Sequence, residues 1–569
     1  MKKQNPNAPL DFVVPIQHIY DTVLFAERDA GDQIAYTFKD PKDPKKINEV
    51  TFKNFAEDVR GFGSALAEIG ADTGHIAIVA DNSYRWIVTY LTSICSKGVF
   101  FPIDKQLPED QLLNVLQKGD ATAIICSKKF QKFFSESREK LPQVKTYIAI
   151  DADEDSADYL SFNKLLSHGK ELVQNGFSAY TKDLGKGDID QMKVLTFTSG
   201  TTGLAKGVML SERNLMGIVY YGQQIARVYT KGLSVLPYHH SYEMVAGILV
   251  SLHKHANLCI NESLAMVLKN LSFYQPDYVY LVPAFLDLFY KKIVQTMKEQ
   301  GKYEKFQKGV KISAAMRKIG IDLRPKLFKD IHKVFGGKLR KIVVGGAPLR
   351  PDTAKFFDDV GIFVTNGYGI TECSPLVSVN RDEFCDNLTV GVKIPCVEVK
   401  IENPGEDGNG EILVKGDTVM LGYYKMPEET AQALKDGWFH TGDLGNINAL
   451  GQISITGRAK NLVVLDNGKN VYPEEVENYI MLLPYVKEAV VSGVDDGEKI
   501  ILQAEVFLDK DAVQKMKDAG EEAPDEAKIL ADARKALEPL PSYKRVSRVV
   551  IRDTEFTKTT TNKIKRNYH

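Results

Sequence analysis

The chain has 569 residues, of which 44% are hydrophobic and 26% are charged, and its formal net charge is −1. This composition is ordinary for a globular protein, and the near-zero charge argues against a nucleic-acid partner. A chain of this length exceeds what one hydrophobic core supports, which predicts a large multi-lobed domain and a smaller one.

The six cysteines are scattered and form no Cys-x-x-Cys pair. This argues against a zinc site or a disulfide framework and favours a reducing compartment. The opening Met-Lys-Lys-Gln-Asn-Pro has no apolar segment after it, and the longest apolar stretch, 86–101, is too short and polar to span a bilayer. We therefore expect a cytoplasmic protein, with peripheral contact at the inner membrane face left open.

Strand-like apolar runs alternate with amphipathic helical patterns from residue 75 to about 380. The predicted strands are 75–79, 98–103, 121–126, 146–150, 194–197, 278–282, 341–344 and 362–365. This alternation is typical of βαβ units and predicts largely parallel sheets. Within it, the segment 290–338 is helical in pattern, basic, and rich in Phe and Ile.

The pattern changes near residue 388. Short strands are separated by tight turns at 403–410 and 448–451, which predicts an antiparallel β subdomain. After Gly457, a helix near 473, strands at 489–494 and 500–507, and a helix near 525–537 predict a small α+β domain. The acidic segment 511–526 is expected to be a solvent-exposed segment outside the core of this domain. The expected domains are residues 1–457 and 458–569.

Residues 193–207 combine a short strand with a loop rich in hydroxyls and glycines. Glycines let backbone N–H groups approach an anion, hydroxyls add donors, and a lysine adds charge, so we predict a phosphate-binding loop. It is not a Walker A loop, because Ala205 precedes the lysine and Gly207 follows it. The candidate residues are Thr198, Ser199, Gly200, Thr201, Thr202, Gly203 and Lys206.

Two further groups follow predicted strands. Gly346 and Ala347 come after strand 341–344, and the run from Asn366 to Glu372 comes after strand 362–365. In open α/β sheets, ligands bind beyond the carboxyl ends of strands. Small residues there leave room for a flat ring beside the backbone. Asn366 offers an amide for a purine edge.

Other residues complete a nucleotide site. Tyr368 offers a stacking face, Thr371 offers a hydroxyl, and Glu372 offers a hard oxygen for Mg²⁺. Asp443, expected on a loop, suits ribose hydroxyls, and Arg458 adds a permanent positive charge.

These motifs resemble those of the adenylate-forming acyl-CoA synthetases, the superfamily that includes luciferases and peptide-synthetase adenylation domains. The matching segments are 198–206, 368–372, 441–443, 457–460 and 558–564. The last segment departs from the family pattern, because Thr557 replaces a proline and Asn562 replaces a glycine. Asn tolerates the left-handed conformation better than most residues, so Lys563 can still be presented.

The resemblance implies an N-terminal AMP-binding domain with two mainly parallel α/β sheets and an antiparallel β subdomain. It also implies a mobile C-terminal domain that turns about Lys460. ATP, Mg²⁺ and coenzyme A are the implied cofactor and substrates. The resemblance implies that Lys563 and Thr371 act at the α-phosphate, that the loop 198–206 holds the β- and γ-phosphates and that Glu372 binds Mg²⁺. It also implies that Asp443 and Arg458 bind ribose, that Gly367 belongs to the ATP site, and that adenine is framed by Gly346, Ala347, Asn366 and Tyr368.

By the same resemblance, Gly468, Lys469 and Asn470 lie near the coenzyme A arm. His239, His240 and Met244 are expected near the acyl group, with His240 beside the carboxylate. Long-chain fatty acyl-CoA synthetases carry an insertion near 290–338, so a long- or medium-chain fatty acid is the expected substrate, with a long-chain acid favoured. Chain length and oligomeric state stay open.

Three alternatives remain at this point. The chain could be an enzyme of the same fold that uses an aryl acid or loads acyl carrier protein. It could be a nucleotide-binding protein without turnover, although the intact candidate residues argue against this. It could also be a P-loop NTPase, which would release ADP and phosphate instead of AMP and pyrophosphate.

Overall fold

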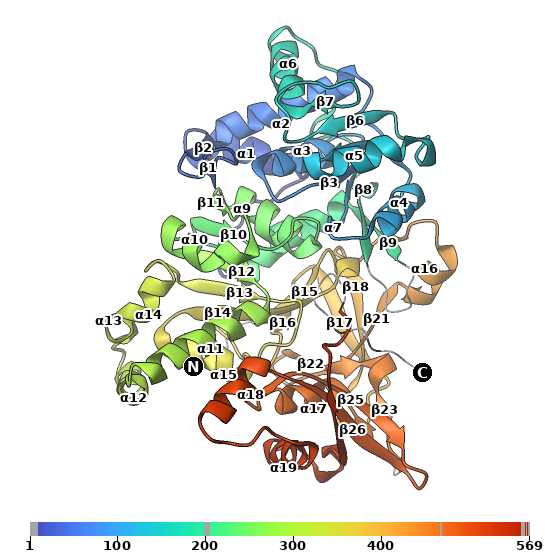
Figure 1. Cartoon of the computed structure of the whole chain (residues 1–569). Coiled ribbons are helices and arrows are strands. Elements are labelled where there is room, and N and C mark those ends of the chain that lie inside the picture. Colours follow the sequence, from blue (N-terminus) through green and yellow to red (C-terminus); the bar gives the residue numbers. More distant parts are fainter. Residues whose placement is uncertain (1–8, 199–204, 467–468, 559–563, 565, 567–569) are drawn as a thin grey trace.

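The computed structural model describes residues 9–198, 205–466, 469–558, 564 and 566. Figure 1 shows an elongated molecule, with the N-terminal α/β layers at the top, a second α/β unit in the middle and the C-terminal segment at the bottom. The predicted α/β class, with mainly parallel sheets and a separate antiparallel sheet, is confirmed. The domain boundary at residue 457 stays a prediction.

In the described ranges, one sheet contains eight strands in the order β19-β9-β8-β4-β3-β5-β6-β7. Strands β3 to β8 run parallel, whereas β9 and β19 add antiparallel at one edge. Their bounds are β3 His75–Val79, β4 Val99–Pro102, β5 Ala121–Cys126, β6 Thr146–Ala149, β7 Leu160–Ser161, β8 Met192–Thr198, β9 Lys206–Ser211 and β19 Gly422–Tyr423.

Helices cover both faces of this sheet. Alternate side chains of a strand point to opposite faces, so Ile76 and Ile78 enter one core while Ala77 and Val79 enter another. The first core receives α2 Phe52–Glu68, α3 Tyr84–Ile94 and α6 Phe162–Gln174. The second receives α4 Glu109–Lys118 and α5 Lys128–Glu136.

A second sheet has the order β16-β15-β14-β13-β12-β10-β11-β1-β2 among the described residues. Its central strands are parallel, and the edge pairs β1–β2, β14–β15 and β15–β16 are antiparallel. The strands are β1 Ile34–Lys39, β2 Ile47–Thr51, β10 Lys231–Ser234, β11 Asn257–Ile260, β12 Tyr278–Leu281, β13 Lys341–Val344, β14 Phe363–Gly369, β15 Leu376–Val379 and β16 Val392–Lys393.

One core lies between the two sheets and contains Ile78 of the first and Tyr278 of the second. The opposite face of the second sheet packs on α10, α11, α14 and α15. The helices of this unit are α1 Tyr20–Ala30, α7 Glu212–Gly217, α8 Gln223–Ile225, α9 Val250–His253, α10 Val267–Tyr274, α11 Pro283–Glu299, α12 Tyr303–Arg317, α13 Arg324–Leu327, α14 Lys329–Val334, α15 Pro351–Val360 and two π-helices, Ile218–Gly222 and Tyr242–Leu249.

The antiparallel sheet predicted after residue 388 is present, with its two tight turns at β17–β18 and β21–β22. Its elements are β17 Val397–Glu402, β18 Gly410–Gly416, α16 Pro427–Ala433, β20 Leu434–Lys435, β21 Trp438–Ile447 and β22 Ile453–Arg458. The short 3₁₀ helices are Arg138–Lys140, Thr181–Asp183, Leu264–Met266, Thr371–Cys373, Ala459–Asn461 and Ser542–Lys544.

The C-terminal segment has its own hydrophobic core, which includes Val476, Val491 and Ile529. Its elements are β23 Val463–Val464, β24 Asn470–Val471, α17 Pro473–Ile480, β25 Val486–Asp495, β26 Ile500–Leu508, α18 Lys510–Asp518, α19 Glu526–Ala536 and β27 Arg548–Arg552. The predicted helix near 473, both strands and the helix near 525 are confirmed.

Four details differ from the sequence expectations. Strand β14 continues to Gly369 and does not end at residue 365, so Asn366 lies within it. Asp443 lies within strand β21 and not on a loop, because β21 continues through Gly442, whose positive φ of 68° bends it without ending it. The stretch 511–526 is partly helical, since Asp509 caps α18 by accepting from Asp511 and Ala512. The loop after Thr198 returns as antiparallel strand β9, an element absent from the sequence expectations.

Candidate functional site

The carboxyl ends of β13 and β14 bring two of the predicted groups together. Val344, the last residue of β13, pairs with Asn366 of β14, so the Gly346-Ala347 turn that follows β13 lies next to the Asn366–Tyr368 run. This run lies inside β14, which continues to Gly369, and does not follow the strand as the sequence indicated. Gly346 has a φ of 84°, a conformation that favours glycine, and both Gly346 and Ala347 are exposed. Asn366 is 5% exposed and donates to the Thr389 carbonyl. Within the part of the chain that the structure describes, its Oδ1 has no hydrogen-bond partner.

A buried amide oxygen without a partner is costly, and a ligand that donates a hydrogen bond to it would remove that cost. An exocyclic amine on a purine is such a donor. This geometry therefore fits the predicted role of Asn366 at an adenine edge.

Tyr368, Asp443 and Arg458 form a connected polar group. The Tyr368 hydroxyl donates to Asp443 Oδ2 at 2.6 Å, and Arg458 Nε lies 2.6 Å from Asp443 Oδ1. Asp443 and Arg458 face each other as register partners on β21 and β22. Burial raises the pKa of Tyr368 well above its usual range, and the Asp443 charge raises it further. The phenol therefore stays protonated and remains a donor.

The bend at Gly442, just before Asp443, is held by Thr441, which lies in the matching segment 441–443, and by Glu411, which the sequence expectations do not include. The Thr441 hydroxyl donates to the Ile412 carbonyl at 2.7 Å and accepts from the Asp443 N–H at 3.0 Å. Glu411 Oε1 accepts from the Gly442 N–H at 3.0 Å. Glu411 and Gly442 are 31 residues apart in sequence. The pairing of β18 with β21 brings them together, and no local motif indicates it.

Lys206, Tyr423 and Glu372 form a second group. Lys206 Nζ lies 4.7 Å from the centre of the Tyr423 ring, and the Tyr423 hydroxyl donates to Glu372 Oε1 at 3.0 Å. Burial, followed by the Glu372 charge, raises the pKa of Tyr423. Sequence reasoning misses Tyr423 because it lies on β19, which joins β9 from more than 200 residues away in sequence.

Thr198 and Lys206 are register partners at the ends of β8 and β9. The loop between them is thus closed by an antiparallel hairpin, with the lysine fixed at the first residue of the returning strand. The other predicted phosphate-binding residues, Ser199, Gly200, Thr201, Thr202 and Gly203, lie outside the described residues.

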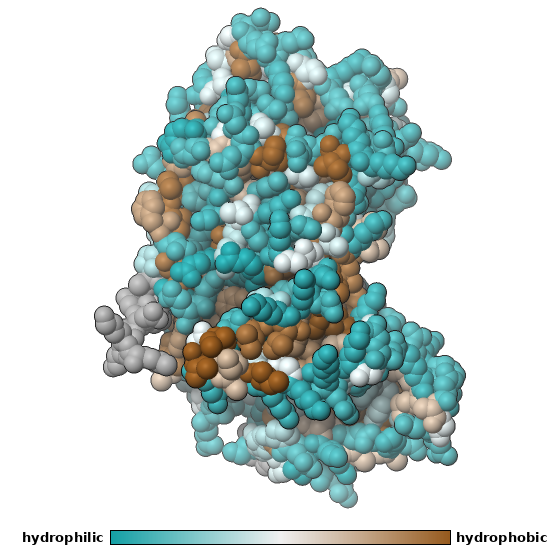
Figure 2. Space-filling model, turned by 90° about the vertical axis from the view of Figure 1, so that its left-hand side faces the viewer, coloured by the Kyte–Doolittle hydropathy of each residue, from teal (hydrophilic) through white to brown (hydrophobic). Residues whose placement is uncertain are grey.

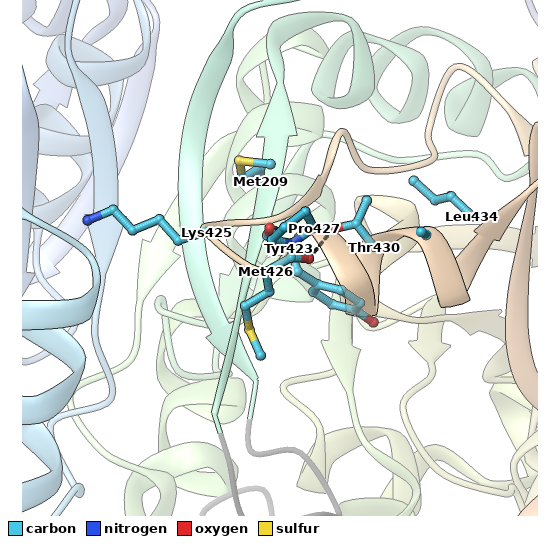
Figure 3. A pocket seen from close by; sticks show the side chains of 8 residues that line it. Met209, Tyr423, Lys425, Met426, Pro427, Thr430 and Leu434 are labelled. Carbon is cyan, nitrogen blue, oxygen red and sulfur yellow. Dashed lines mark hydrogen bonds between the residues drawn. The ribbon is translucent and has the colours of Figure 1, made fainter.

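Tyr423 also lines an apolar pocket of about 420 Å³. Figure 3 shows Met209, Met426 and Leu434 around it, while Lys425 points away from the other side chains. The Thr430 hydroxyl accepts from the Tyr423 N–H at 2.9 Å and so ties α16 to β19. Among the residues that the structure describes, none of the predicted site residues lines this pocket.

The predicted acyl-site residues follow β10 and enter the π-helix Tyr242–Leu249. The ring centres of His239 and His240 are 4.1 Å apart, and His239 Nε2 lies 3.7 Å from Asp104 Oδ2. Burial lowers the pKa of His239 to about 4, so this ring is neutral at pH 7. Met244 is fully buried in the core between the sheets.

At the other end of the chain, Lys460 follows Arg458 in a 3₁₀ helix. Burial lowers the pKa of Lys460, and the positive charges of Arg458 and Lys206 lower it further. Lys469 Nζ lies 3.4 Å from Glu406 Oε2, and Asn470 begins β24. Gly468 and Lys563 lie outside the described residues.

Residues on both sides of Lys563 are anchored to the C-terminal core. Lys558 pairs with Glu488, and Arg566 Nη2 donates to both carboxylate oxygens of Glu477 at 2.6 Å. Burial raises the pKa of Glu477 to about 7, whereas Arg566 opposes that rise. These two pairs fix the chain on either side of the predicted catalytic lysine.

The AMP-binding enzyme family matches residues 25–424. A long-chain-fatty-acid–CoA ligase, FadD15 of Mycobacterium bovis, is 27% identical over 485 residues, which cover 82% of this chain and 78% of the relative. A chloroplastic long-chain-fatty-acid–[acyl-carrier-protein] ligase of Arabidopsis thaliana, AEE15, is 28% identical over 542 residues, which cover 82% and 73%.

Among solved structures, ATP-bound MatB from Rhodopseudomonas palustris superimposes with a TM-score of 0.73. The match covers 96% of this chain and 97% of MatB at 22% identity. This likeness establishes a shared fold.

Proposed function

Because the chain belongs to the AMP-binding enzyme family, we propose that it is an acid–thiol ligase that activates a fatty acid with ATP and transfers the acyl group to coenzyme A. The observation that carries the proposal is the Tyr368–Asp443–Arg458 group beside the carboxyl ends of β13 and β14. It offers a carboxylate and a cation for ribose next to a buried acceptor for adenine. Relatives named for long-chain fatty acids support the choice of acid.

The proposed reaction has two steps. A carboxylate oxygen attacks the α-phosphorus of ATP, and the bond to the bridging oxygen breaks, so pyrophosphate leaves with the bonding electrons. The thiol sulfur of coenzyme A then attacks the acyl carbonyl carbon after losing its proton, and AMP leaves. The products are acyl-CoA, AMP and pyrophosphate.

Negative charge grows around the α-phosphorus and the bridging oxygen during the first step, and fixed donors and cations there lower the barrier. In our proposal Thr371 and Lys563 act at this phosphorus, and Thr198, Lys206 and the loop between them hold the outer phosphates. Asp443 and Arg458 orient the ribose so that the α-phosphate meets the carboxylate. His240 lines the acyl site, beside His239 and Met244.

Magnesium fits this donor set, because Glu372 is a hard oxygen ligand whose Oε1 is already oriented by Tyr423. Mg²⁺ commonly keeps several waters and binds through one or two carboxylates plus substrate phosphates. When bound, it would neutralise charge on the phosphates of ATP.

We further propose that the C-terminal segment, from residue 458, alternates between two positions about Lys460. One position brings Lys563 to the nucleotide, and the other brings Gly468, Lys469 and Asn470 to the pantetheine arm.

In the described ranges of the chain, no helix is long and apolar enough to cross a bilayer. All six cysteines are described, and each is a free thiol. We propose a cytoplasmic protein with peripheral contact at the inner membrane face. Its substrate, a long-chain acid, partitions into membranes.

Product analysis tests the proposal. Purified protein, ATP, MgCl₂, coenzyme A and a series of fatty acids are incubated, and nucleotides are separated. Acid-dependent formation of AMP and pyrophosphate is expected, and release of ADP and phosphate would overturn the proposal.

The same assay tests a second acceptor, because AEE15 is named for acyl carrier protein. Replacing coenzyme A by phosphopantetheinylated acyl carrier protein, with AMP release held constant, separates the two acceptors. Aryl acids in the same panel test the remaining alternative.

A further inference from the structure

The helical segment 283–338 has a charge unlike that of the rest of the chain. It contains 14 Lys or Arg against five Asp or Glu, a net formal charge of +9, whereas the whole chain carries −1. The remaining residues therefore carry −10. A surface with this contrast attracts anionic partners within about a Debye length.

Large apolar side chains lie on the outside of the same segment. Ile312 on α12 is 54% exposed, and Ile319, just after that helix, is 69% exposed. Figure 2 looks at the side on which α12, α13 and α14 form the edge of Figure 1, and hydrophobic residues gather there in a patch bordered by hydrophilic ones. From α12 to α14 the exposed large apolar residues are Ile312, Ile319, Ile321, Leu327 and Val334, and Leu288 on α11 is exposed as well.

The inner side of α12 is anchored, which directs the remaining side chains outward. Phe306 packs against Phe328 and Phe356, with ring centres 5.4 Å and 5.7 Å away. The arginines are also engaged, since Arg317 and Arg324 each lie 3.2 Å from an oxygen of Asp358. The apolar residues are thus interspersed with exposed lysines, among them Lys308, Lys311, Lys318 and Lys326.

We propose that this face, α12 to α14 with residues 318–323, docks on an anionic lipid bilayer. Lysines attract the negative headgroups while isoleucine and leucine side chains enter the interface, the combination by which amphipathic surfaces bind membranes. This inference rests on the peripheral membrane contact proposed above and identifies the surface that makes it. Docking would hold the enzyme at the membrane, where its fatty-acid substrate accumulates.

The test is co-sedimentation of the full chain with vesicles. Binding to phosphatidylcholine vesicles containing 30% phosphatidylserine is expected, with little binding to phosphatidylcholine alone and release at high salt.

Two double variants test the surface. Lys311→Gln with Lys318→Gln should weaken vesicle binding about 25-fold, since each lysine near an anionic surface contributes roughly fivefold. Ile312→Ser with Ile319→Ser should weaken it as well, and its residual binding should become more salt-sensitive.

Lys515→Gln with Lys517→Gln, on exposed positions of α18, is the matched control and should bind as the wild type does. Equal binding to neutral and anionic vesicles, or equal losses in the control and the Lys311 variant, would refute the assigned surface. A lipid-free dimer that only the α12 variants disrupt would also overturn it, in favour of a second copy as the occupant.

AMP release with a long-chain fatty acid carried on serum albumin, in buffer without vesicles, is measured in parallel. Normal turnover of all variants shows that they are folded. Turnover without vesicle binding contradicts only the proposal that this face docks on a bilayer. Vesicle binding without turnover contradicts only the proposed reaction.

Discussion

At the residue scale, the candidate site depends on a buried carboxylate whose two oxygens have different partners. Asp443 is 4% exposed, and it accepts from Tyr368 on one oxygen while Arg458 lies against the other. Burial makes such an ion costly to leave unpaired, so the group is held in one orientation. A ribose diol would meet a preformed acceptor.

Replacing Asp443 by asparagine tests this role. The Asp443→Asn variant keeps an acceptor for Tyr368 but removes the charge facing Arg458, so the KM for ATP should rise by about 10–100-fold with a smaller change in kcat. Steady-state AMP release measures both constants. Tyr368→Phe is the comparison, because it removes only the hydroxyl donor. An unchanged KM for ATP in the Asp443 variant would remove Asp443 from the ribose site.

Glu243 provides a prediction about pH. It is fully buried, accepts from the Ser234 hydroxyl at 2.5 Å, and burial raises its pKa to about 8. The unfolded chain releases this proton near its ordinary pKa of 4.5, whereas the folded chain holds it. Native stability therefore falls as pH rises between about 4.5 and 8.

Glu243→Gln removes this titration and keeps the hydrogen-bond acceptor. The variant should gain stability relative to the wild type as pH rises from about 6 to about 8, by about 1–3 kcal/mol. Thermal unfolding at both pH values measures the difference. A difference in unfolding free energy between variant and wild type that stays constant across this pH range would contradict the prediction that Glu243 is buried in its neutral form.

At the element scale, the site is assembled by sheet edges that meet from distant parts of the sequence. Strand β18 supplies Glu411 to the turn in β21, and β19 supplies Tyr423 to Glu372. These contacts position groups that we propose to bind the ligand, although neither Glu411 nor Tyr423 belongs to a recognisable motif. The strand pairings therefore decide where the motif residues point.

Glu411 should behave as a positioning residue. Glu411→Ala leaves the Gly442 N–H without its acceptor and should raise the KM for ATP several-fold, whereas Glu411→Gln keeps an acceptor and should restore most of the affinity. A merely structural role would lower thermal stability without this rescue. Equal KM values for the Ala and Gln variants would rule out positioning through the hydrogen bond.

Much of the fold could be predicted because its signals are local. The predicted strands at 121–126 and 341–344 match their observed bounds, and the motif residues Asn366 to Glu372 follow one another in the chain. The features that could not be predicted depend on pairing between strands that are far apart in the sequence. Tyr423 and Glu411 have ordinary neighbours, and β1 and β2 join a sheet whose other strands begin near residue 231.

At the scale of the whole molecule, the two proposed half-reactions need different groups at one site. The pairs Lys558–Glu488 and Arg566–Glu477 attach Lys558 and Arg566, the described residues on either side of Lys563 in the sequence, to the C-terminal core. Lys563 belongs to the C-terminal segment that we propose to alternate between two positions. Lys563 should therefore contribute to the rate of only one of the two half-reactions.

Lys563→Ala should slow adenylation by roughly 10²–10³, the scale for losing one charge-stabilising donor. Thioester formation from preformed acyl-adenylate and coenzyme A should be nearly unchanged. Rapid-quench measurement of each half-reaction separates the two. Equal losses in both would contradict domain alternation.

The pairing of β1 with β11 has a consequence for biosynthesis. Thr37 meets Cys259, which lies 222 residues later in the chain. At about 5–20 residues per second, the ribosome needs on the order of 10–40 s to deliver that partner. During this interval β1 exposes an unpaired edge to other nascent chains, and chaperones that shield such edges would protect the growing polypeptide.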